Sequence, residues 1–230
     1  MILIADAHIN SNRTTTHDFF QMLERISETA YDVVFLGDIF ELWIALDRYE
    51  DDNHRRFLSW CRREKQTRSV GYVEGNHEFF LALEHSDCFT WCEPRFKHLE
   101  EKRLGFCHGD MINADDWKYR LFRILTKNRA AKFLVEYMPL APRAVRVIKE
   151  KMTNTNKERG YMPKDSVTRY ADNTLCDTLP RIFTGHFHVD FSYGKNEFSF
   201  YSLPDWMATG KITVYDEISG DVNSMHWSSL

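Results

Sequence analysis

The chain has 230 residues, 43% of them hydrophobic, and it carries a net charge of −4 at pH 7. This length and apolar content suffice for one sizeable core, so we expect a single domain over residues 1–230. No apolar stretch approaches the roughly 18 residues of a transmembrane helix, which argues against a protein that spans a membrane.

Five short apolar runs, each typical of a buried strand, form the framework of the chain. In chain order they read ILIADAH, DVVFLGD, SVGYVEGNHE, RLGFCHGD and RIFTGHFH. Each is followed by polar side chains at the strand's carboxyl end, and open α/β sheets bind ligands at that edge. We therefore expect one crevice to gather Asp6, His8, Asp38, Asn76, His108, His186 and His188.

The chemistry of these seven side chains indicates metal binding. They are too many for one ion and about right for two, and mixed oxygen and imidazole ligands without thiolate suit Mn²⁺, Zn²⁺ or Fe²⁺. Asp38 follows a central strand between the two ligand groups, so it is the natural bridge between ions about 3.5–4 Å apart. Water shared by two such ions ionises near pH 7 and can attack a phosphorus atom in line. The pattern predicts a hydrolase with two divalent ions, Mn²⁺ being our first choice.

The motifs differ in how specific they are. Asp-x-His and Gly-Asp occur by chance in many chains, whereas Gly-Asn-His-Glu and Gly-His-x-His are more specific. All five motifs in this order, each after a predicted strand, argue strongly against coincidence. The remaining histidines fall outside the strand ends, and we interpret them as ordinary core or surface residues: His17, His54, His85, His98 and His226.

Together, these motifs resemble the five blocks of the calcineurin-like metallophosphoesterases. The resemblance implies an α/β fold, a four-layer α/β/β/α sandwich of two mixed sheets with a dinuclear site at one edge. His77 would be the catalytic histidine, unligated beside the phosphate, with a role as an orienter of ligands as the alternative. Glu78 and Asp110 would brace ligands. One ion would be held by Asp6, His8, Asp38 and His188, and the other by Asp38, Asn76, His108 and His186.

A long insertion separates the fourth motif from the fifth. We expect a helical cap over residues 115–170, with one helical run at 117–138 and a second at 143–152. Residues 117–152 contain ten Lys or Arg against two Glu, whereas the rest of the chain is acidic, which argues against a general nucleic-acid binder.

Two interpretations of this basic, amphipathic insertion are open. It is either an ordinary packed helix pair with a solvated charged face or a surface for anionic lipid. Its position beside a phosphoesterase site favours a lipid-admitting, membrane-facing cap.

A narrower resemblance concerns the residues around the motifs. Phe40-Glu41-x-Trp43, Asp115-Asp116-x-x-Tyr119-x-x-Phe122-Arg123 and Asn156-Lys157-Glu158 resemble the UDP-2,3-diacylglucosamine hydrolases of lipid A biosynthesis. The resemblance implies cleavage of the pyrophosphate of UDP-2,3-diacylglucosamine to UMP and 2,3-diacylglucosamine 1-phosphate. His77 stands where that family often has Arg. Implied substrate-binding residues are Asn76, Asp116, Asn156 and Lys157.

Simpler roles are open for three of the surrounding residues. Asp116 is also placed to cap a helix that begins at Trp117. Lys157 is either a phosphate contact or a solvated side chain, and Trp43 either lines the site or fills the core.

Two other functions are open for this chain. The alternatives are a phosphodiesterase or pyrophosphatase acting on a soluble nucleotide, and a scaffold of this fold without catalysis.

The first strand begins at Ile2, so we expect no signal peptide. The odd number of cysteines, without paired Cys-x-x-Cys spacing, favours reduced thiols. We expect a cytoplasmic enzyme, peripheral to the cytoplasmic face of the membrane.

Overall fold

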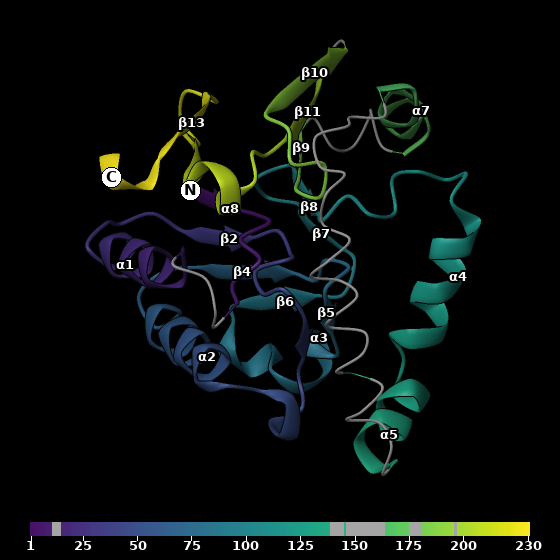
Figure 1. Ribbon diagram of the computed structural model, residues 1–230. Coiled ribbons are helices and arrows are strands. Elements are labelled where there is room, and N and C mark those ends of the chain that lie inside the picture. Colours follow the sequence, from purple (N-terminus) through teal and green to yellow (C-terminus); the bar gives the residue numbers. More distant parts are fainter. Residues whose placement is uncertain (11–14, 139–144, 146–163, 175–180, 196) are drawn as a thin grey trace.

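The computed structural model describes residues 1–10, 15–138, 145, 164–174, 181–195 and 197–230 (Figure 1). Two mixed β-sheets form its centre. In the six-stranded sheet, the strands run in the order β13-β12-β1-β2-β4-β6, and β1, β2, β4 and β6 are parallel. Its strands are β1 (Ile2–Ile4), β2 (Val33–Phe35), β4 (Val70–Val73), β6 (Trp91–Glu93), β12 (Lys211–Tyr215) and β13 (Val222–His226).

The second sheet has five strands in the order β10-β11-β9-β8-β7, with β8, β9 and β11 parallel. Its strands are β7 (Phe96–Leu99), β8 (Leu104–Cys107), β9 (Arg181–Thr184), β10 (Phe191–Lys195) and β11 (Phe198–Ser202). A further parallel pair joins β3 (Trp43–Ile44) to β5 (Glu78–Phe79). The five strands predicted from the sequence are all present, as β1, β2, β4, β8 and β9.

Side-chain alternation along the strands explains how the layers pack. In β1, Ile2 and Ile4 belong to the core shared with α1 (Thr15–Ser27) and α2 (Asp52–Glu64). Leu3 points to the other face and packs in the core between the two sheets, with Phe106 and others. A strand that alternates between two buried faces must be apolar throughout, as these strands are.

The remaining helices are short or lie at the margins. Asp51 caps α2 by accepting hydrogen bonds from the backbone N–H groups of Asn53 and His54. Figure 1 shows α4 and α5 along the edge of the molecule opposite α1 and α2. The other helices are α3 (Leu81–Glu84), α4 (Trp117–Thr126), α5 (Arg129–Tyr137), α7 (Lys164–Thr174), α8 (Trp206–Thr209) and the 3-10 turns η1 (Asp47–Tyr49), η2 (Ser86–Cys88) and η3 (Trp227–Ser229).

The predicted α/β fold with two mixed sheets is confirmed. On the outer face of the five-stranded sheet, α7 contributes Val167 to a core with Ile182 and Phe200. A complete fourth layer of helices stays a prediction. Within the described part of the chain, none of the helices has the length and apolar character needed to cross a membrane.

The prediction of one continuous helix over 117–138 is wrong, because the chain breaks into α4 and α5 at Asn128. The side-chain carbonyl of Asn128 accepts from Ala131 N–H at 2.9 Å and caps α5. Its amide donates to the carbonyls of Ile124 and Leu125 at the end of α4. One side chain thus satisfies backbone groups of both helix ends. The second helical run at 143–152 lies outside the described residues, apart from position 145, and the cap as a domain insertion stays a prediction.

Candidate metal site

The loops after five parallel strands place the predicted ligands at one edge of the two sheets. Most of these ligands lie on strained backbone: φ is 54° at Asp6, 43° at His8, 54° at Asp38, 70° at His186 and 55° at His188. A non-glycine residue in this left-handed region costs on the order of 1–3 kcal/mol, and such strain gathers at functional sites. The fold therefore holds these side chains against their local preference.

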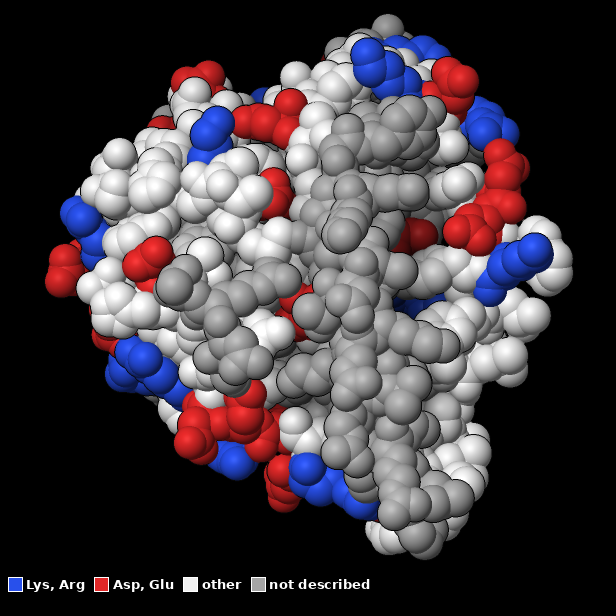
Figure 2. Space-filling model, viewed as in Figure 1, with Lys and Arg blue, Asp and Glu red and all other residues white. Residues whose placement is uncertain are grey.

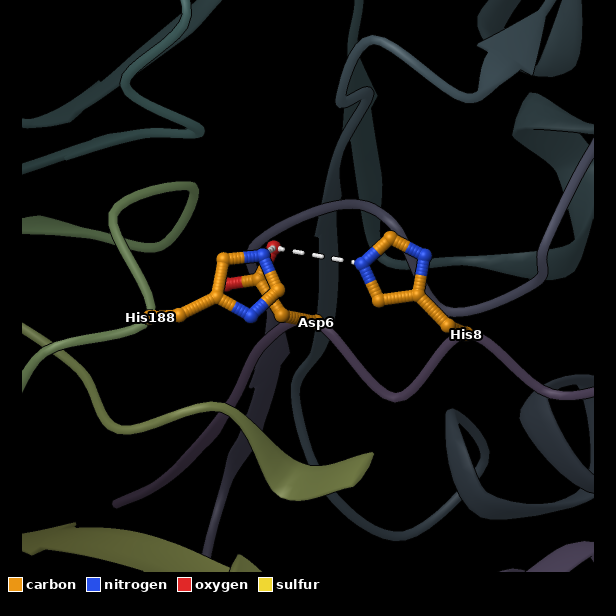
Figure 3. Close-up of side chains that lie close together, drawn as sticks. All are labelled: Asp6, His8 and His188. Atoms are coloured by element: carbon orange, nitrogen blue, oxygen red, sulfur yellow. Dashed lines mark ion pairs between the residues drawn. The ribbon is translucent and has the colours of Figure 1, made fainter. Parts of the chain in front are cut away.

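One group consists of Asp6, His8 and His188 (Figure 3). Asp6 Oδ1 lies 3.9 Å from His8 Nε2 and 3.6 Å from His188 Nε2, and the two rings are stacked with centroids 5.4 Å apart. This oxygen is buried and accepts no hydrogen bond from the described residues. A buried carboxylate oxygen between two imidazoles fits a divalent cation.

Asp38 lies between this group and the next. Its Oδ2 is 4.0 Å from His8 Nε2, 3.6 Å from His77 Nε2 and 3.4 Å from His108 Nε2. Two ligands each about 2.0–2.2 Å from one ion are roughly 3–3.5 Å apart, so these spacings fit metal ligands after small adjustments. Asp38 thus lies close to ligands of both predicted groups, and its role as a bridge stays a prediction.

The third group is centred on Asn76. Its Oδ1 is 2.9 Å from His108 Nε2 and 3.0 Å from His186 Nδ1. His108 Nδ1 donates to the carbonyl of Leu36 at 2.7 Å, which leaves Nε2 facing Asn76 and Asp38. A histidine fixed through one nitrogen by a backbone carbonyl is a common arrangement for a metal ligand.

Opposing effects set the charges of these buried groups. Burial raises the pKa of Asp6 to about 6, although the nearby His188 and His108 lower it. Burial also favours neutral Asp38, but His108 and His77 outweigh it and hold the pKa of that carboxyl well below its usual range. Burial would lower the pKa of His108, but the negative charge of Asp38 raises it to about 10. Without metal, an imidazolium at His108 therefore supplies the positive charge that Asp38 needs.

His186 differs from His108 in its protonation. Burial, reinforced by the neighbouring His108, lowers the pKa of His186 to about 4. Its ring is therefore neutral near pH 7, which is the form that binds a metal ion.

The contacts of His77 define which of its nitrogens faces the site. Its Nδ1 contacts the carbonyl oxygen of Glu41, which can only accept, so Nδ1 carries the hydrogen. Nε2 then points towards Asp38. Candidate ligand atoms of His8, Asp38 and His77 lie within 4.8 Å of one another, a grouping that the motifs do not predict. A role for His77 as a metal ligand is thus the alternative to its predicted catalytic role.

Glu78 braces the loops that carry the ligands, as the sequence predicted. Its carboxylate accepts from the backbone N–H groups of Asp38, Ile39 and Gly75 at 2.7–3.0 Å, and from the hydroxyl of Tyr72. A Cβ at Gly75 would lie 2.2 Å from Asp38 Oδ1, so only glycine allows this close approach.

Sequence reasoning missed Asp205, whose Oδ2 lies 3.6 Å from His188 Nδ1 and caps α8 through Ala208 N–H. Asp205 follows a strand outside the five motifs, and an Asp directly before a short helix was the only available signal.

The structure places several other predicted residues. The side chain of Asp116 accepts from Tyr119 N–H at 3.0 Å and caps α4, so its predicted capping role is confirmed. Its substrate contact stays a prediction. Trp43 is fully buried and donates to Glu50, which confirms the core interpretation. Asn156 and Lys157 lie outside the described residues.

A solvated basic face was one of two interpretations of the insertion, and two of the basic side chains of α4 do not fit it. Arg123 is only 1% exposed, and Lys127 Nζ donates to the carbonyl of Gly75. The apolar side chains face outward instead: Trp117 is 63% exposed and Leu125 62%. Asp110 explains the reversal, because it draws Arg123 inward. Figure 2 shows the mostly uncharged edge where α4 and α5 lie.

Comparisons with known proteins give relatives that match most of the chain. No family model matches the chain. The chain is 25% identical over 217 residues to a UDP-2,3-diacylglucosamine hydrolase from Haemophilus ducreyi, covering 88% of this chain and 90% of the relative. It is 26% identical over 230 residues to one from Aeromonas salmonicida, covering 93% and 88%. A solved archaeal phosphodiesterase has a TM-score of 0.48 at 10% identity, with 97% of each chain covered.

The clustered ligand residues and the hydrolase relatives indicate a metal-dependent phosphoesterase, and the predicted resemblance to the calcineurin-like metallophosphoesterases is confirmed. The predicted resemblance is confirmed at the finer level too: the curated relatives it matches over most of its length are named UDP-2,3-diacylglucosamine hydrolases.

Proposed function

We propose that the chain cleaves the pyrophosphate of UDP-2,3-diacylglucosamine to UMP and 2,3-diacylglucosamine 1-phosphate, using two divalent ions, with Mn²⁺ the first choice. The observation that carries the proposal is the convergence of the strand-end ligands on both sides of Asp38. The proposed substrate is taken from the names of the relatives reported above.

The ions, when bound, would ionise a water molecule near neutral pH and neutralise the phosphoryl oxygens. Asp6, His8 and His188 would hold one ion, and the remaining ligands Asn76, His108 and His186 the other. Asp38 is shared by both groups. The strained backbone and the contacts of Glu78 keep these side chains in place before substrate arrives, so little reorganisation is needed during the reaction.

His77 would act on the substrate itself. Its Nδ1 is fixed by the carbonyl of Glu41, so Nε2 is the atom that can reach a phosphoryl oxygen. When protonated, Nε2 would donate a hydrogen bond to that oxygen and stabilise the charge that develops on it. UMP is a stable anion, so its departure needs little help from a general acid.

The outward apolar side chains of α4 and α5 favour a lipid substrate over a soluble nucleotide. Phe122 is 50% exposed, and Phe133 and Leu134 of α5 are exposed as well. An apolar surface of this kind on a soluble domain marks a site of contact with lipid or protein. We propose that it serves the acyl chains and the cytoplasmic face of the membrane, so the enzyme would be peripheral.

The test compares detergent-dispersed UDP-2,3-diacylglucosamine with soluble UDP-N-acetylglucosamine, measuring release of UMP in Mn²⁺. Each buried methylene contributes about 0.8 kcal/mol, so even two give a preference of more than roughly tenfold in kcat/KM for the lipid. Equal or greater activity on the soluble compound would favour the alternative, a pyrophosphatase of soluble nucleotides. No hydrolysis of either compound would contradict both.

A further inference from the structure

The inward face of α4 is attached to two loops of the metal site through Arg123. Its Nη1 donates to Asp110 Oδ2 and lies 3.4 Å from the carbonyl of Gly75. Its Nη2 donates to the carbonyls of Glu74, at 3.3 Å, and Pro94. The planar guanidinium thus connects the ends of β4 and β6 to the segment after β8, which a lysine could not do with one nitrogen.

Two further side chains of α4 strengthen this connection. Lys127, one turn after Arg123, donates from Nζ to the carbonyl of Gly75, and the ammonium lies 4.8 Å from the ring centroid of Phe79. The hydroxyl of Tyr119 donates to Asp110 Oδ2. Asp110 is therefore held by two partners, and Gly75 by two cations.

The two attached loops serve the same half of the metal site. Gly75 directly precedes Asn76, and Asp110 is separated from His108 by Gly109 alone. Asn76 and His108 are themselves in contact at 2.9 Å. Among the described contacts, none joins Arg123 or Lys127 to the loops that carry Asp6, His8 or His188.

We propose that Arg123, with the assistance of Lys127, is a positioning residue for one metal ion only, the ion held by Asn76, His108 and His186. The inference rests on the proposed two-ion site. Asn76 is an uncharged ligand, so it adds little attraction of its own, and its contribution depends on being held in the correct place. Because the opposite face of α4 is apolar and exposed, this helix links the proposed lipid-facing surface to one half of the metal site.

The experiment measures Mn²⁺ binding to metal-free protein by isothermal titration calorimetry. Arg123→Met is compared with wild type and with Arg129→Met, the same change at an exposed residue of α5. We expect two ions in wild type and in the control. In Arg123→Met we expect one ion at unchanged affinity, while the Kd of the other rises at least about tenfold, in line with the loss on removing groups that orient ligands.

Further substitutions in the Arg123→Met background identify the ion that stays. His188→Ala should abolish its binding, whereas Asn76→Ala should leave it unchanged. The inference would be overturned if Asn76→Ala abolished binding of the remaining ion and His188→Ala left it unchanged. It would also be overturned if Arg123→Met bound both ions with unchanged affinity, or lost affinity for both equally. A wild-type protein that binds one ion would contradict the two-ion proposal itself, which is a separate outcome.

A second variant covers the case in which Arg123→Met does not fold because Asp110 is left buried and unpaired. Lys127→Met keeps the pair of Arg123 and Asp110, and removes the hydrogen bond to Gly75 together with the contact to the ring of Phe79. It should weaken the same ion in the same direction by a smaller factor. Two ions of wild-type affinity in a folded Lys127→Met protein, with Arg123→Met unfolded, would show that the inward cations serve folding alone.

Discussion

Asp38 and His108 form a buried ion pair at the centre of the metal site, with 3.4 Å between Oδ2 and Nε2. The charge of Asp38 raises the pKa of His108 to about 10, and His108 in turn holds the pKa of Asp38 far below its usual range. The proton on His108 occupies the nitrogen that a metal ion would use. Binding of metal must therefore displace it.

Metal binding should release about one proton near pH 8, where His108 is protonated without metal and unprotonated with it. Below about pH 6, Asp6 is also protonated without metal, because its pKa is about 6. Metal binding should then release a second proton. The affinity for metal should thus fall with decreasing pH, about tenfold per pH unit for each proton displaced. Calorimetric titration in buffers of different ionisation enthalpy measures the number of protons, and none released near pH 8 would refute the protonated His108.

Asp38→Asn should lose bound metal and nearly all hydrolysis of an aryl phosphodiester, because an amide cannot bridge two cations with a full negative charge. Metal analysis together with the activity assay checks this. Asp18→Asn makes the same change at an exposed position of α1 and should behave as wild type. Two bound ions in purified Asp38→Asn would rule out the bridge.

His77→Ala should keep its metal and lose turnover by roughly 10²–10⁴, the usual effect of removing a proton-donating group. Measuring metal content and kcat on the same preparation separates the two roles open to this residue. A loss of metal as severe as in Asp38→Asn would make His77 a ligand, as its position beside His8 and Asp38 allows.

Replacing Phe122 and Leu125 by Ser should weaken binding to anionic vesicles and turnover of the lipid substrate by about tenfold or more, because burying each side chain contributes about 1.5–3 kcal/mol. Hydrolysis of a small aryl phosphodiester should stay unchanged. Ile218→Ser provides the control, since Ile218 is 99% exposed in a turn far along the chain. Unaltered vesicle binding in the double variant would mean that the apolar face of α4 does not meet lipid.

The arrangement of the metal site was largely predictable from the sequence, and the orientation of the cap helix was not. Asp38 and His108 each follow an apolar run with an adjacent glycine, so strand, turn and ligand are encoded within a few residues. Arg123 was misjudged because its partner Asp110 lies thirteen residues earlier, and only the folded chain brings the two charges together. The break at Asn128 had a local signal, since asparagine is a favoured helix cap.

The left-handed backbone lowers the stability of the protein at positions that its activity requires. These positions are Asp6, His8, Asp38, His186 and His188. Glycine would occupy each of these positions without steric cost, yet it would remove a ligand. Selection for heat resistance alone would therefore favour substitutions at these ligand positions before substitutions in the hydrophobic core. The strain is therefore retained because these side chains are needed as ligands.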